Sequence, residues 1–244
     1  MLHKKVEIIS DLLQICQMVT EKMHISVKDF RRVIHKVIFG IFVGIFVVSI
    51  SIQCEESSLP KGLPDGQVVL LTGIVTRNGE PLTIESTVKQ GDQIETGKGS
   101  SVEMIFAKGL IIRLGANSKA ILQLKNSQIQ LNTGWFATIK NANNQKLEVV
   151  TPTAMAAVRG TALFIKVESE TSTYACTCNG TVHYHSGEAT DEAITAKAHK
   201  ALRFVKEGQK FKQKPAGLEY HNNTDIELLA KKINHPLDWT KSSN

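Results

Sequence analysis

Two cysteines and two histidines near the C-terminus are the residues best suited to chemistry. Cys176 and Cys178 lie two positions apart, so on a β-strand both thiols would point to the same face. His199 and His221 follow, and thiolates and imidazoles are the ligands that zinc and other soft metals prefer. The Cys-x-Cys spacing is shorter than the Cys-x-x-Cys usual in zinc sites. We therefore expect two buried apolar thiols and no cofactor, with an oxidised pair or a zinc-type site as alternatives.

The sequence carries none of the common catalytic motifs. It has no Gly-x-Ser-x-Gly, no His-Glu-x-x-His and no phosphate-binding loop. Asp92, Glu95 and Glu103 are expected to be solvated carboxylates of strands or turns, and not an acid–base pair. We predict that the protein is not an enzyme.

The charge balance is basic, with a formal net charge of +6 and an isoelectric point near 9.1. Such a balance suits nucleic acid or an anionic membrane. The lysines and arginines are scattered, however, and no stripe of basic and aromatic residues is present. The sequence therefore predicts no nucleic-acid partner.

An almost unbroken apolar run, residues 37–53, predicts a membrane anchor. Arg31, Arg32 and Lys36 precede it, and Glu55 and Glu56 follow. Positive charge on the N-terminal side predicts that residues 1–36 are cytoplasmic and that everything after the run is extracytoplasmic, in the periplasm or an equivalent space.

Two kinds of anchor fit this run. In the first, it is a single transmembrane helix. In the second, it is the apolar core of a lipoprotein signal, and Cys54 is lipidated and becomes the mature N-terminus. Gln53 fits a lipoprotein signal poorly, because a small residue is preferred there. A true start at Met23 instead of Met1 would give a normal basic signal region.

The rest of the chain must position the cysteines and histidines, and it is expected to be mainly β. Short alternating runs such as Val102, Met104 and Phe106 recur from residue 68 onward, and Asn78-Gly79 and Asn179-Gly180 predict hairpin turns. A capping box at residues 224–227 predicts a short C-terminal helix. The predicted organisation is a basic segment 1–36, an anchor 37–53, a linker 54–67, a β domain 68–170 and a β extension with a helix 171–244.

One stretch stands out within the β region. Thr151-Pro152 predicts a turn, and small residues then lead to Arg159-Gly160-Thr161. An arginine in such a run needs a partner if it leaves water. We expect Arg159 to be buried or half-buried, paired with carbonyls or with a carboxylate such as Glu103 or Asp92, in a structural role.

Four segments in order resemble the FecR domain family. They are GIVTRNGE at 73–80, GDQIETG at 91–97, RLGANS at 113–118 and TPTAMAAVRGT at 151–161. The resemblance implies a rolled, solenoid-like β fold. Thr151, Pro152, Arg159, Gly160 and Thr161 are the residues that match the family's most recognisable motif.

The resemblance also frames the functional expectation. We expect a membrane-anchored, extracytoplasmic binding module for an envelope protein or another component of the cell envelope. One alternative is a transmembrane FecR-type regulator of a sigma factor in an envelope or iron-uptake response, although residues 1–36 are shorter than the sigma-binding part of such regulators. Another is a structural lipoprotein with a cysteine–histidine metal site.

Overall fold

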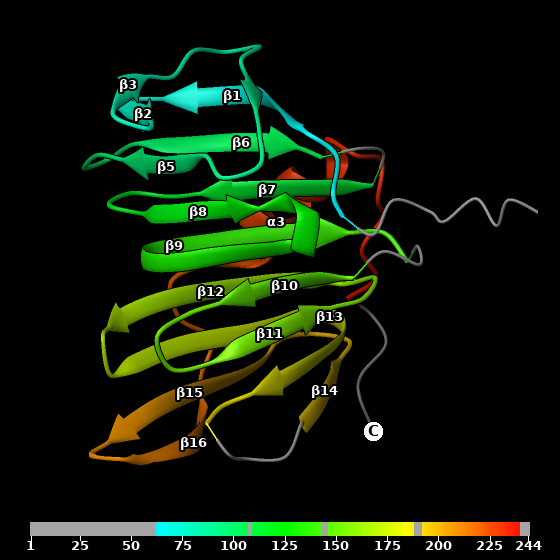
Figure 1. Ribbon diagram of the computed structural model, residues 1–244. Coiled ribbons are helices and arrows are strands. Elements are labelled where there is room, and N and C mark those ends of the chain that lie inside the picture. The colour runs from blue at the N-terminus through cyan, green and yellow to red at the C-terminus, as the bar shows by residue number, and fades with distance from the viewer. Residues whose placement is uncertain (1–61, 107–108, 143–145, 188–191, 240–244) are drawn as a thin grey trace, which may run out of the picture. The chain divides into compact units, whose positions relative to one another are not determined.

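The computed structural model describes residues 62–106, 109–142, 146–187 and 192–239, which lie within one compact unit. The predicted anchor, Cys54 and both candidate start residues lie outside the described residues. Within the described part of the chain, no helix is long and apolar enough to span a membrane. The expectation of a mainly β fold with one short C-terminal helix is confirmed (Figure 1).

The strands form two sheets that are joined through shared strands. Neighbours in sheet A, in order, are β4 (Thr87–Val88), β1 (Gly66–Thr72), β6 (Ser101–Ile105), β7 (Leu110–Leu114), β9 (Gln128–Lys140), β12 (Ala162–Ser169), β13 (Ser172–His185), β15 (Lys200–Glu207) and β16 (Lys210–Ala216). Neighbours in sheet B are β3 (Glu80–Pro81), β2 (Val75–Arg77), β5 (Gln93–Thr96), β8 (Lys119–Gln123), β9, β10 (Leu147–Val150), β11 (Met155–Val158), β13 and β14 (Glu192–Ala196). A short 3-10 turn, η1 (Leu124–Asn126), follows β8. Among the described strands, every pair is antiparallel except β9 with β10.

The two long strands, β9 and β13, each pass from one sheet to the other at a glycine. The residues of β9 before Gly134 pair with strands of sheet B, and the residues from Gly134 onward pair with strands of sheet A. From Gly180 onward β13 pairs within sheet B, and before it within sheet A. Both glycines have positive φ, 80° and 103°, which favours glycine over other residues.

The hairpin predicted at Asn179-Gly180 is therefore wrong, because the backbone freedom of Gly180 bends one continuous strand instead of reversing it. The predicted turn at Asn78-Gly79 is confirmed. Both of its residues have positive φ, and they connect the antiparallel pair β2 and β3.

The main hydrophobic core lies between the sheets. The alternation predicted for Val102, Met104 and Phe106 is confirmed, since all three are buried in this core. Strands β12 and β13 on either side of the predicted boundary at residue 170 pair with each other, so the C-terminal extension continues the sheets.

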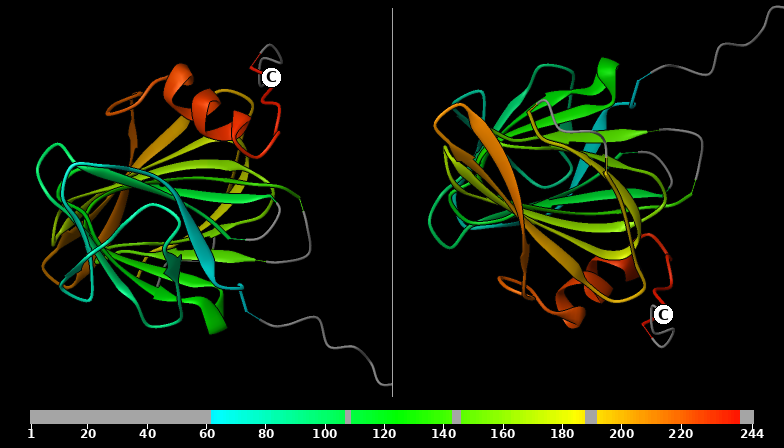
Figure 2. Two further views of the ribbon diagram at one scale, coloured as in Figure 1. Left: turned by 90° about the horizontal axis from the view of Figure 1, so that it is seen from above. Right: turned by 90° about the horizontal axis from the view of Figure 1, so that it is seen from below.

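A second, smaller core covers the outer face of sheet A. Helix α3 (Asn223–Lys231) lies against the outside of the β body (Figure 2). Its Ile226, Leu229 and Ala230 pack in one cluster with sheet residues that include Ile139 and Phe164. The helix begins earlier than predicted. Asn222 is its N-cap and forms the capping box with Asp225, in place of residues 224–227.

Candidate functional site

Cys176 and Cys178 lie on the sheet A part of β13 and are fully buried. The side chain of Ala175 belongs to the core between the sheets, whereas both cysteines belong to the cluster under α3. The two thiols therefore share the outer face of sheet A, as the two-residue spacing predicts.

His199 reaches the cysteines from the loop between β14 and β15. Its backbone N–H donates to the carbonyl of Cys178 (3.1 Å), and its φ is +33°. Its Nδ1 lies 3.5 Å from Cys176 Sγ, and its Nε2 lies 2.8 Å from Asn223 Oδ1. The amide oxygen accepts, so Nε2 carries the proton and Nδ1 presents its lone pair to the sulfur.

His221 reaches the cysteines from the segment just before α3. Its Nε2 lies 3.2 Å from Cys178 Sγ, and its Nδ1 lies 2.9 Å from the carbonyl oxygen of Glu219. A carbonyl oxygen only accepts, so Nδ1 is the protonated nitrogen and Nε2 faces the sulfur with a lone pair. The ring stacks on Phe164, with centroids 4.3 Å apart.

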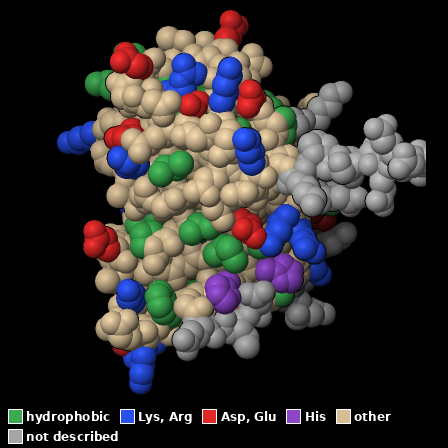
Figure 3. All heavy atoms as spheres, viewed as in Figure 1, with side chains coloured by type: hydrophobic (Ala, Val, Ile, Leu, Met, Phe, Trp, Pro, Cys, Tyr) green, Lys and Arg blue, Asp and Glu red, His purple; other side chains and the backbone are tan. Residues whose placement is uncertain are grey.

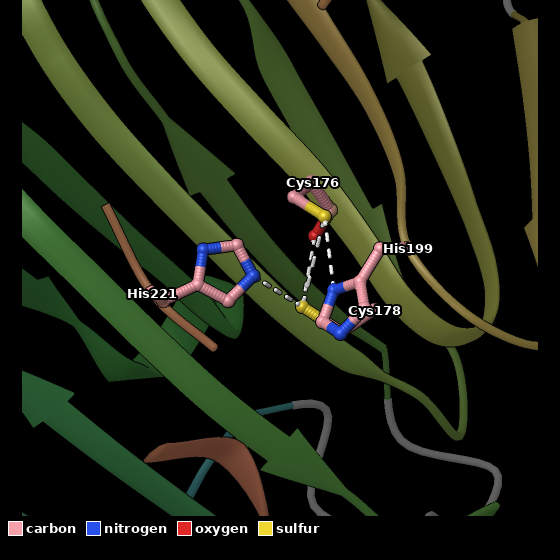
Figure 4. Close-up of side chains that lie close together, drawn as sticks. All are labelled: Cys176, Cys178, His199 and His221. Carbon is pink, nitrogen blue, oxygen red and sulfur yellow. Dashed lines mark hydrogen bonds between the residues drawn. The ribbon is translucent and has the colours of Figure 1, made fainter. Parts of the chain in front are cut away.

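The ligand-type atoms of all four residues lie within 4.8 Å of one another (Figure 4). The two sulfurs are 3.9 Å apart, and both cysteines are free thiols in this structure. The four residues named as the metal-site alternative are thus brought together. The histidines are 23 and 43 positions from the cysteines that they contact.

The cluster favours one negative charge. The hydrogen bond that Cys178 donates to Cys176, together with the two neighbouring imidazoles, lowers the pKa of Cys176 to about 4 against the cost of burial. Burial raises the pKa of Cys178. Burial lowers the pKa of His199, but its hydrogen bonds with Cys176 and Asn223 outweigh this and raise the pKa overall. The site can therefore hold a thiolate beside two imidazoles, which suits metal ligation or thiol redox chemistry.

Several residues of the cluster carry no sequence signal. Asn223 and the backbone carbonyl of Glu219 orient the two imidazoles. Trp239 stacks on His199 with ring centroids 5.0 Å apart and donates its Nε1–H to Glu227 (2.6 Å). No spacing rule links these groups to Cys176 and Cys178, because their proximity arises from packing of the C-terminal segment.

The expectation for Arg159 is wrong. Its side chain is exposed, and it lines a hollow with residues that include Lys146, His183 and His185. Histidine and cationic side chains lie close together on the visible face in Figure 3. The physical reason is that β11 ends at Val158, so the chain leaves the sheet before Arg159 and turns at Gly160.

The carboxylates proposed for Arg159 have other partners. Asp92 accepts from the side-chain amide of Asn78 (2.9 Å) and from the backbone N–H of Lys89 (2.8 Å). Glu103 is buried and accepts from Arg113 and Lys232, so its prediction as a solvated carboxylate is also wrong.

The other motif residues shape turns and a corner. Thr151 Oγ1 donates to the carbonyl of Ala154 (2.8 Å), and exposed Pro152 lies within that turn. Thr161 Oγ1 donates to the carbonyl of Asn179, next to the corner of β13. At Gly160 a Cβ atom would lie 2.8 Å from Ala142 Cα. These motif residues stabilise turns and a strand bend of the domain.

Together, the fold and the cluster define a mainly β protein in which a C-terminal segment closes over the outer face of one sheet. Residues 92–183 match the family described as FecR protein, and this part of the chain is a FecR domain. The predicted resemblance is confirmed.

Two crystal structures of a candidate anti-sigma factor from Parabacteroides distasonis are similar to this chain, each with 12% sequence identity and a TM-score of 0.42. Each match covers 50% of this chain and 59% of the other chain. No curated protein matches the sequence.

Proposed function

We propose that this protein is a FecR-type regulator in which residues 37–53 cross the membrane and the β domain lies outside the cytoplasm. The observation that carries the proposal is the FecR domain at residues 92–183. The charges that flank the apolar segment support the same orientation, with Arg31, Arg32 and Lys36 before it and Glu55 and Glu56 after it.

In this proposal the domain acts by contact with an envelope protein or another envelope component, and it is not an enzyme. Its most recognisable motif is used for turns and for the corner of β13, which points to a scaffold whose surface does the work. We propose a rolled β unit, because β9 and β13 wind the chain from one sheet to the other at Gly134 and Gly180. Residues 1–36 would then contact a sigma factor on the cytoplasmic side.

A second candidate function shares the β domain but has no cytoplasmic part. A cysteine at the end of the apolar segment favours lipidation of Cys54. Cleavage before Cys54 would remove every residue able to reach a sigma factor. The protein would then be a lipid-anchored binding module of the envelope.

One experiment separates the two candidates. The full chain, tagged at its C-terminus, is expressed in its native host and extracted from membranes in detergent. Its N-terminal mass is measured, and the proteins that co-purify with it are identified. Cys54→Ser is the matched variant, because it abolishes lipidation and leaves the apolar segment intact.

The regulator proposal expects an amino end at Met1 or Met23, and a sigma factor that co-purifies equally with the wild type and with Cys54→Ser. It also expects the sigma factor to be lost when residues 1–30 are deleted. A mature protein that begins at an acylated Cys54 contradicts the regulator and establishes the lipid-anchored module.

A further inference from the structure

The geometry points to a new site: we propose that Cys176, Cys178, His199 and His221 bind one zinc ion. We further propose that this ion fastens the C-terminal segment, defined as residues 217–239, to sheet A. The inference goes beyond the proposed function and does not depend on it, since it concerns only residues of the described β unit.

The spacing of the four atoms fits tetrahedral zinc. In a tetrahedral zinc site the Zn–S bonds are about 2.3 Å long and the Zn–N bonds about 2.0–2.1 Å. Two sulfur ligands are then about 3.8 Å apart, and a sulfur and a nitrogen ligand are about 3.6 Å apart. The observed separations are 3.9 Å between the sulfurs, 3.5 Å from Cys176 Sγ to His199 Nδ1 and 3.2 Å from Cys178 Sγ to His221 Nε2. Small shifts of the side chains would complete the coordination shell.

The hydrogen-bond partners of the histidines fit the same role. In zinc sites, a ligating histidine usually donates its other ring N–H to a carbonyl or carboxylate, which fixes the tautomer and the ring orientation. Here the carbonyl of Glu219 fixes His221, and Asn223 Oδ1 fixes His199. Both remaining nitrogens therefore present lone pairs to the sulfurs (Figure 4).

The charge count also favours a divalent ion. Two thiolates neutralise Zn²⁺, and two neutral imidazoles complete the shell without adding charge, so the buried site carries no net charge. The surroundings are apolar and aromatic: Phe164 covers His221, and Trp239 covers His199. Both cysteines are fully buried, so water does not reach the two sulfurs, whereas His199 is half-buried.

A disulfide fits the cluster less well. Residues two apart on a strand have Cα atoms about 6.6 Å apart, at the upper end of the disulfide range of about 4.4–6.8 Å. Oxidation would also leave the lone pairs of both histidines without a partner inside an aromatic pocket.

The ligands come from three separate segments, so a bound ion would cross-link them. The cysteines lie on β13, His199 lies in the loop before β15, and His221 leads into α3. The FecR match ends at residue 183. Two ligands therefore belong to the FecR domain, and the other two belong to the chain that follows it.

Polar contacts hold the C-terminal segment on both sides of the site. The hydroxyl of Tyr174 donates to the carbonyl of Gly217 (3.0 Å) and accepts from the N–H of Glu219 (3.1 Å). At the far end of α3, Lys232 pairs with Glu103. The ion would lie between these two sets of contacts, so packing of the C-terminal segment against sheet A would depend on the metal.

The test uses the full chain purified in detergent, without chelator, and compares its metal content by mass spectrometry with that of two variants. Cys178→Ser removes one ligand. His183→Ala is the matched control, because His183 is an exposed histidine on the same strand as the cysteines. We expect one zinc per chain in the wild type and in His183→Ala, and less than about a tenth of that in Cys178→Ser.

Cobalt gives a second readout that does not require Cys178→Ser to be well folded. Wild type loaded with Co²⁺ should show thiolate-to-cobalt charge transfer and the intense visible bands of a tetrahedral ion. It should also lose tryptophan fluorescence, because Trp239 stacks on a ligand and Trp135 stacks on Phe164 (5.5 Å). Asn223→Ala, which keeps all four ligands, should weaken zinc binding by about 10–100-fold in a chelator competition.

Three results would overturn the inference. One is a reduced wild-type protein that takes up no zinc or cobalt. The second is a purified chain that contains a Cys176–Cys178 disulfide, or a metal other than zinc. The third is zinc that remains at one per chain in Cys178→Ser.

Discussion

Replacing Glu103 by glutamine tests how the C-terminal segment is held. The carboxylate is 1% exposed, and it bridges two cations from distant parts of the chain. Its Oε1 accepts from Arg113 Nε (2.9 Å) and Nη2 (2.6 Å), and its Oε2 accepts from Lys232 Nζ, 129 positions away. Glutamine preserves the shape but removes the charge and one acceptor.

The cost follows from these contacts. A hydrogen bond to a charged group contributes about 1.5–3 kcal/mol, and removing one member of a fully buried ion pair costs about 3–5 kcal/mol. Here the side chains of Arg113 and Lys232 are 18% and 35% exposed, so water can solvate part of the charge that is left unpaired. We expect Glu103→Gln to lower the free energy of unfolding by about 2–3 kcal/mol.

The assay is urea unfolding of the full chain, followed by tryptophan fluorescence. With a slope of about 2 kcal/mol per molar urea, the midpoint should fall by about 1–1.5 M. Glu207→Gln is the matched control, because exposed Glu207 also pairs with two lysines, Lys212 and Lys214. Its midpoint should not move. An unchanged midpoint in Glu103→Gln, or equal shifts in both variants, would show that the buried Glu103 does not hold the C-terminal segment.

Three further predictions follow from other parts of the structure. The hydrogen bond from Arg203, assisted by Ser172, lowers the pKa of Glu168 from 4.5 to about 2. The stabilisation that ionised Glu168 contributes is complete above pH 4.5 and is lost as the pH falls toward 2. The urea midpoint of Glu168→Gln should therefore depend less on pH over that range than the midpoint of the wild type. Equal pH dependence in the two proteins would show that Glu168 does not contribute this stability. Gly180→Ala should lower the free energy of unfolding by at least about 2 kcal/mol in a thermal melt, because φ is 103° and the new Cβ would lie 2.6 Å from Thr161 Oγ1. A variant as stable as the wild type would show that β13 does not need a glycine where it bends. Arg159→Ala should change stability by less than about 0.5 kcal/mol in the same melt, because the side chain is exposed, and a larger loss would reveal a structural partner.

Local sequence patterns predicted much of the fold. Alternation identified the buried face at Val102 and Met104, because side chains of neighbouring strand residues point to opposite faces. The Asn179-Gly180 pair fits two different structures, a hairpin turn and a bend within one strand. Positive φ at a glycine serves a hairpin and a strand corner equally, and only the pairing of β13 with strands of both sheets decides between them.

Long-range packing explains what the sequence could not predict. Alternation places Glu103 opposite Val102 and Met104, on a face that would be solvated without the C-terminal segment. The shared face of Cys176 and Cys178 follows from their spacing alone. The position of His199 and His221 next to the cysteines depends on a loop and on the packing of α3 against sheet A, and no local sequence pattern predicts either.

A crystal structure of the full chain, with diffraction data recorded on both sides of the zinc absorption edge, would show directly whether the four residues bind zinc. We expect one anomalous peak bonded to Cys176, Cys178, His199 and His221, with the C-terminal segment closed over it. A peak elsewhere, or a disulfide in place of the peak, would disprove the zinc site.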